Sequence, residues 1–105
     1  MNVLTFKVIG GEELVANVIH IGDDFIQATD VVVLQMMQHP ESGKPVQAFG
    51  DWPALAKRDT GEPLRIPVSA LLTMPTEAHE ELTRHYISNV TGLELPPVTP
   101  KILLS

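Results

Sequence analysis

The chain contains no cysteine, few aromatic residues and few basic ones. Without cysteine, disulfides, thiolate metal sites and a cysteine nucleophile are all excluded. Aromatic residues make up 5% of the 105 positions, and 7 Lys and Arg stand against 13 Asp and Glu, for a net charge of −6. A chain this acidic is poorly suited to bind duplex nucleic acid through contacts with phosphates alone.

Long apolar runs are lacking too, since no stretch approaches the roughly 18 residues that a membrane span needs. The N-terminus has no basic stretch leading into a long apolar block, so no secretory leader is expected. These absences predict a cytoplasmic protein with no membrane contact. The length of 105 residues fits one domain, and the apolar share of 44% suffices for one modest core.

The groups that would assemble an enzyme are missing as well. No serine stands in a nucleophile-elbow pattern, and the four histidines are scattered rather than grouped as zinc ligands. Gly10-Gly11 precedes two glutamates, which would repel a phosphate. The sequence therefore predicts a protein without catalysis, metal or cofactor.

Alternating apolar residues and short glycine turns predict β structure in the first 38 residues. Leu4, Phe6 and Val8 alternate with polar residues, as expected for a half-buried strand. Gly10-Gly11 and residues 22–24 have the composition of hairpin turns. Three strands are therefore predicted: one from Leu4, one over about 13–21, and one over about 25–38 that bends near Asp30.

The second half of the chain predicts short strands followed by a helix. Proline and glycine make residues 39–63 mostly loop, with a brief strand over 46–49. Pro67 divides the apolar stretch 64–74 into two short strands. Thr76 is expected to cap a helix over about 76–89, which Gly92 ends. Its apolar stripe consists of Ala78, Leu82, Tyr86 and Val90.

These elements predict a mainly β fold, a small five-stranded, strongly bent antiparallel open barrel with one C-terminal helix. The domain should span residues 1–92. Residues 93–105 are rich in proline yet apolar, which predicts that they pack on their own domain or on a neighbouring subunit.

Residues 8–18 resemble the first half of the Sm motif of Sm-like proteins, the group that includes Hfq. Gly11 matches the turn glycine of that motif. The alternating apolar, small and apolar positions that follow are matched by Leu14, Ala16 and Val18. Residues 23–27 are similar to the family's run of aspartate, any residue, aromatic, hydrophobic residue and asparagine, with Gln27 in place of asparagine. The Arg-Gly or Lys-His pair of the second Sm motif is missing from residues 64–74.

The order of further features resembles a divergent group of small marine phage proteins assigned to the Sm-like fold. Glu12-Glu13, Trp52-Pro53 and Tyr86 follow that order, and the likeness covers about 90 of the 105 residues. It implies a homo-oligomeric ring, because Sm-like proteins join the edge of one subunit to the next. About five to seven subunits are expected.

The resemblance implies that the ring binds single-stranded RNA or DNA. Phe25 would stack a base, while Asp23 and Gln27 would hydrogen-bond to the groups around it. The basic residues that would meet phosphates from the long loop are Lys44, Lys57 and Arg58.

Two alternatives remain open at this point. Phe25 could instead be an aromatic at a strand start, packed under the loop. The oligomer could also serve as a protein–protein adaptor or phage assembly module without nucleic acid, which the net charge of −6 favours.

Overall fold

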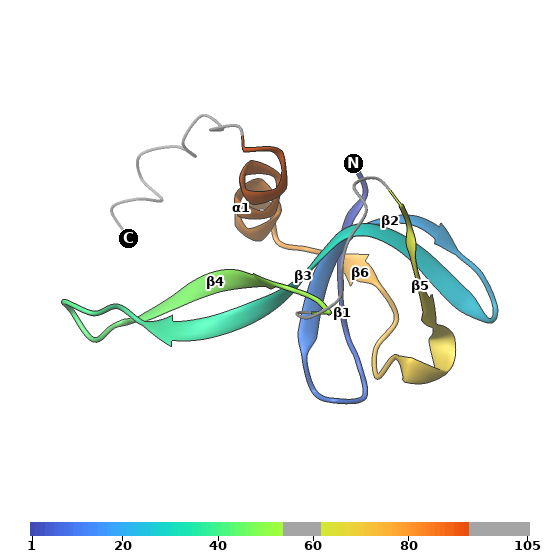
Figure 1. Cartoon of the computed structure of the whole chain (residues 1–105), viewed down its shortest axis with the longest axis horizontal. Coiled ribbons are helices and arrows are strands. Elements are labelled where there is room, and N and C mark those ends of the chain that lie inside the picture. Colours follow the sequence, from blue (N-terminus) through green and yellow to red (C-terminus); the bar gives the residue numbers. More distant parts are fainter. Residues whose placement is uncertain (54–61, 93–105) are drawn as a thin grey trace.

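Six strands and one α-helix make up the part of the chain that the computed structural model describes, residues 1–53 and 62–92. The strands are β1 (Val3–Lys7), β2 (Glu13–Ile21), β3 (Phe25–Gln38), β4 (Pro45–Asp51), β5 (Leu64–Pro67) and β6 (Thr76–Glu77). A short 3-10 helix, η1 (Val68–Ala70), follows β5, and α1 (Glu80–Thr91) comes last. All strand pairs are antiparallel, in the order β4-β3-β2-β1-β6, with β5 beside β3 (Figure 1). The sheet is not closed, and the prediction of a mainly β, open antiparallel fold with a C-terminal helix is confirmed.

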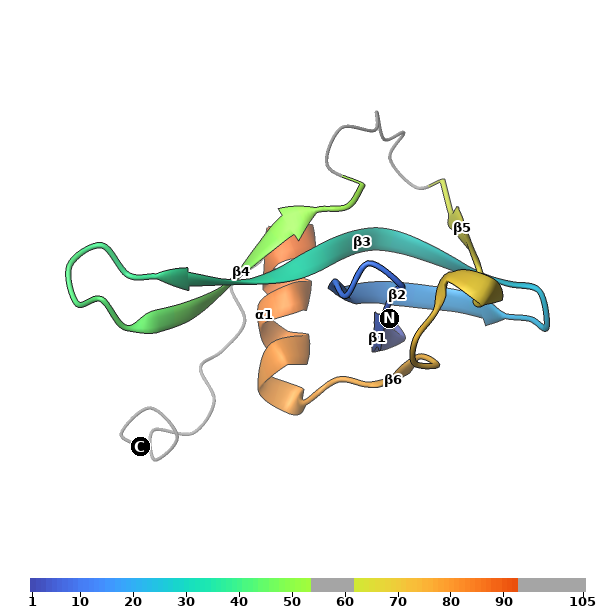
Figure 2. The ribbon, with the colours of Figure 1, turned by 90° about the horizontal axis from the view of Figure 1, so that it is seen from below.

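Strand β3 is the longest element and organises the rest of the sheet. Its first half pairs with β5 and its second half with β4, while β2 lies along its other edge (Figure 2). Between the two halves the backbone of Asp30 has a φ of 52°, a left-handed conformation that residues other than glycine seldom adopt. The predicted bend near Asp30 is therefore present.

The bend changes which side chains of β3 face each core. Ile26 and Ala28 belong to one buried cluster, and strict alternation would place Val32 with them. Val31 joins that cluster instead, and Val32 faces the opposite side of the sheet. Asp30 thus shifts the alternation by one residue, so that both faces of β3 bury apolar side chains.

The two cores lie on opposite faces of the sheet. Strands β1, β2, β3 and β5 curl around the first, which contains Leu4, Phe6, Val8, Leu14, Ala16, Val18, Ile26, Ala28, Val31 and Ile66. The second forms where α1 crosses the other face and packs Tyr86 against Val3, Val15 and Val32. Leu82 and Val90 border this second core, so the part of the predicted apolar stripe that is helical faces the sheet; Ala78 also borders it but lies before α1.

The predicted start of the helix is wrong. Thr76 and Glu77 form β6 and pair with Thr5 and Leu4 of β1, and α1 begins only at Glu80. His79, whose side chain makes no cap hydrogen bond, occupies the N-cap position. The backbone of residues 76–77 satisfies the outer edge of β1, and this long-range pairing outweighs a local capping preference. Gly92 does end the helix, with a left-handed φ of 72°.

The second short strand predicted beyond Pro67 is also wrong. Residues 68–70 form η1, and Leu71 makes only an isolated bridge with Val8. The missing N–H of Pro67 ends the ladder, and the chain turns back toward β1. The predicted strand over 46–49 is longer than expected, because β4 pairs with β3 over seven positions. The expected packing of residues 93–105 falls outside the described residues.

Candidate nucleic-acid interface

The turn between β2 and β3 fixes the position of Phe25. The Gly22 N–H donates to the Phe25 carbonyl at 3.0 Å, and the Val68 N–H donates to the Asp24 carbonyl at 2.8 Å. Ile26 is fully buried beneath the sheet. Because successive side chains of a strand alternate between faces, Phe25 and Gln27 both point to the outer face.

Two residues from neighbouring strands flank Phe25 on that outer face. In the sheet register Gln27 lies between His20 of β2 and Arg65 of β5. The Arg65 guanidinium carbon lies 4.7 Å from the centre of the Phe25 ring, in a cation–π contact. The His20 ring lies 5.9 Å from that of Phe25, tilted by 48°. We call His20, Phe25, Gln27 and Arg65 the Phe25 face.

The Phe25 face has exposed polar groups that are available to a ligand. His20 and Arg65 are exposed, and Phe25 and Gln27 are half-buried. Within the described residues, neither Gln27 nor Arg65 makes a side-chain hydrogen bond or an ion pair. A guanidinium stacked on an aromatic ring gains about 0.5–1 kcal/mol at an exposed site and keeps its N–H donors free at its edge. The arrangement can therefore stack on a planar group and donate hydrogen bonds beside it.

The carboxylates of Asp23 and Asp24 give this end of the sheet a mixed charge. Both side chains are exposed in the turn before Phe25. Two carboxylates next to one guanidinium disfavour dense packing of phosphates. The local charge is instead compatible with uncharged planar groups, such as bases.

Of the six site residues predicted from the sequence, the structure groups only three. Asp23, Phe25 and Gln27 lie together, whereas Lys44 is exposed near the tip of the β3–β4 hairpin, beyond the far end of the 14-residue β3 (Figure 2). Lys57 and Arg58 fall outside the described residues.

The sequence does not predict that Arg65 lies beside Phe25, because nothing local links position 65 to position 25. The one available signal is the alternation around buried Ile66, which places Arg65 on the outer face of whichever strand pairs with its own.

Glu12 and Trp52, which both belong to the resemblance to the phage proteins, contact each other. The indole N–H of Trp52 donates to the Glu12 carboxylate at 2.9 Å, and the Trp52 side chain packs against the first core. The bond joins the end of β4 to the β1–β2 turn, whereas the Phe25 face lies where the β2–β3 turn leads into β3.

No protein-family profile, curated protein or solved structure matches this chain. In residues 1–53 and 62–92, no three His, Asp or Glu side chains gather as potential metal ligands. No helix in the same residues has the length and apolar character that crossing a bilayer requires.

Proposed function

We propose that this protein is a non-catalytic, ring-forming protein of the Sm-like group, which binds single-stranded RNA or DNA on its Phe25 face. The observation that carries the proposal is the Arg65 guanidinium stacked 4.7 Å from the Phe25 ring centre, with the free amide of Gln27 beside it. Bases stack well on aromatic rings and on guanidinium planes, and single-stranded nucleic acid offers its bases unpaired.

Each residue of the face has a distinct task in this proposal. A base stacks on the Phe25–Arg65 pair, an interaction worth about 1–3 kcal/mol. The Gln27 amide, which both donates and accepts, reads the edge of that base. Asp23 accepts a hydrogen bond from a base amine or a ribose hydroxyl. The second Sm motif of this chain lacks its Arg-Gly pair, and in this proposal Arg65 supplies the guanidinium instead.

Ring formation in this proposal uses the two ends of the open sheet. Strand β4 lies at one end, and its hairpin with β3 exposes Met36, Met37 and Val46. At the other end, the short β6 follows a loop that exposes Leu72 and Met74. Head-to-tail pairing of unlike edges satisfies both backbones and closes a ring when the rotation permits it. About five to seven subunits remain our expectation.

The test is a fluorescence anisotropy titration of the ring with oligouridine and oligoadenosine at two salt concentrations. Phe25→Ala should weaken binding about fivefold to 100-fold at both salt concentrations, since it removes a stacking surface. Arg65→Lys keeps the charge and should also weaken binding, because an ammonium cannot stack as a guanidinium does. Lys7→Gln is the matched control, since it removes one exposed positive charge from β1. If the unmutated ring binds neither oligomer at low salt, nucleic-acid binding is wrong.

A second candidate function is an oligomeric protein–protein adaptor or phage assembly module. The exposed apolar side chains of the β3–β4 hairpin and the net charge of −6 favour it. Salt dependence separates the two functions. Nucleic-acid binding through Arg65 weakens as salt rises, whereas an apolar protein contact does not.

A further inference from the structure

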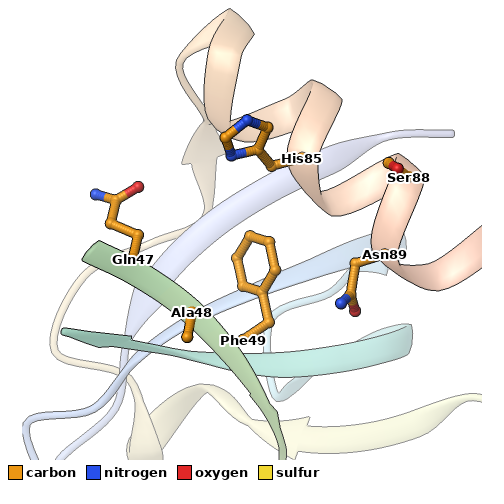
Figure 3. A pocket seen from close by; sticks show the side chains of 6 residues that line it. All are labelled: Gln47, Ala48, Phe49, His85, Ser88 and Asn89. Atoms are coloured by element: carbon orange, nitrogen blue, oxygen red, sulfur yellow. The ribbon is translucent and has the colours of Figure 1, made fainter. Parts of the chain in front are cut away.

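An open groove of about 460 Å³ separates β4 from the C-terminal half of α1 (Figure 3). The residues that line it are Gln47, Ala48, Phe49, His85, Ser88 and Asn89. The three helix residues lie three and four positions apart, so they form one stripe that faces β4. The groove is on the opposite face of the sheet from the first core and belongs to neither the Phe25 face nor the interior of the second core.

The groove combines an aromatic floor with unpaired polar walls. Phe49 is half-buried, and its ring meets that of Tyr86 edge-on at a centroid distance of 6.3 Å. The side chains of Gln47, His85, Ser88 and Asn89 make no hydrogen bond with any described residue. An aromatic floor with such walls suits a polyproline-type segment, whose backbone carbonyls lack internal hydrogen bonds and whose rings pack on aromatic side chains.

We propose that the occupant of this groove is the chain's own C-terminal segment, residues 93–105. Thirteen residues follow Gly92, and they are rich in the proline and apolar residues that suit the groove. Pro96, Pro97 and Pro100 include a Pro-x-x-Pro spacing over residues 97–100, and only Glu94 and Lys101 are charged. The remaining residues are largely aliphatic, so this segment gains from leaving water.

The end of α1 lies beside the groove, because Asn89 lines the groove and Gly92 caps the helix three residues later. The Gly92 N–H donates to the Ser88 carbonyl, and the left-handed Gly92 lets the chain reverse its direction where the helix ends. At about 3.1 Å per residue, Pro96 lies within about 12 Å of Gly92 along the chain. The stripe from Asn89 back to His85 spans only about 6 Å of helix. So short a tether favours the chain's own segment over that of a second copy, because it gives a high effective concentration.

A cysteine cross-link tests the proposal directly, because the natural chain has no cysteine. The full-length variant Gln47→Cys with Val98→Cys is oxidised, and the products are separated without reductant and weighed by mass spectrometry. The control variant, Ile9→Cys with Val98→Cys, puts the first cysteine in the exposed β1–β2 turn, away from both the groove and the Phe25 face. The intramolecular disulfide should form at least about tenfold faster in the groove variant than in the control. Replacing Pro97 and Pro100 by glycine should remove that advantage and leave the described domain untouched.

Three outcomes overturn the proposal. Equal rates in the groove and control variants mean that residues 93–105 sample both sites at random. The absence of any cross-link at Gln47 means that the segment lies elsewhere. A disulfide that forms only between chains means that a second copy fills the groove. Nucleic-acid binding measured on the same variants reports on the Phe25 face alone, so failure of one proposal leaves the other standing.

Discussion

The hydroxyl of Tyr86 should be worth far more than a surface hydroxyl, because it holds the bend of β3. It donates to the Asp30 carbonyl at 2.7 Å, at the residue where the strand adopts a φ of 52°, and Tyr86 itself is fully buried. The substitution Tyr86→Phe keeps the ring in the second core and its edge-on contact with Phe49. It removes only the hydroxyl and leaves the Asp30 carbonyl without this donor.

We expect Tyr86→Phe to lower the free energy of unfolding by about 1–2 kcal/mol, because a net hydrogen bond is lost and a partly buried acceptor is stranded. For a domain of this size the melting temperature should fall by about 4–15 °C. Urea unfolding followed by circular dichroism gives the free energy, at one fixed protein concentration because oligomerisation contributes to stability.

Thr91→Val is the matched control for this measurement. It removes a hydroxyl that donates to the Ile87 carbonyl at 2.6 Å on the exposed surface of the same helix. Its effect should stay within about 0.5 kcal/mol. If Tyr86→Phe unfolds at the same urea concentration as the unmutated protein, the bend does not depend on the hydroxyl and the reasoning is refuted.

Three further predictions concern the bend, the ring and the turn contact. Asp30→Val should cost about 1–3 kcal/mol in urea unfolding, since a β-branched side chain resists positive φ, whereas Asp30→Gly should be neutral or stabilising; equal effects would contradict the left-handed bend. Val46→Lys, in the exposed edge strand β4, should lower the particle mass in light scattering, and the charge change Glu41→Lys at the hairpin tip should not. An unchanged mass would remove β4 from the ring contact. Trp52→Phe should cost about 1 kcal/mol by loss of the bond to Glu12, and most of this cost should vanish in a Glu12→Ala background, which lacks the accepting carboxylate.

The features that depend on neighbouring residues could be predicted from the sequence. Alternation of Leu4, Phe6 and Val8 marked the core face of β1, and all three are buried in the structure. The glycine turns and the four-residue spacing of the helix stripe were equally local, because backbone conformation and side-chain period are set over a few residues. That Phe25 and Gln27 share one face follows from the same alternation.

Contacts between distant residues could not be predicted in this way. Pairing of β5 with the start of β3 brings Arg65 to Phe25, and pairing of residues 76–77 with β1 takes the expected first turn of the helix into the sheet. The Asp30 carbonyl, where the alternation shifts, likewise accepts a hydrogen bond from Tyr86, which lies 56 positions away in the sequence. No local propensity encodes such contacts, because their free energy comes from backbone pairing and burial between segments that the folded chain alone brings together.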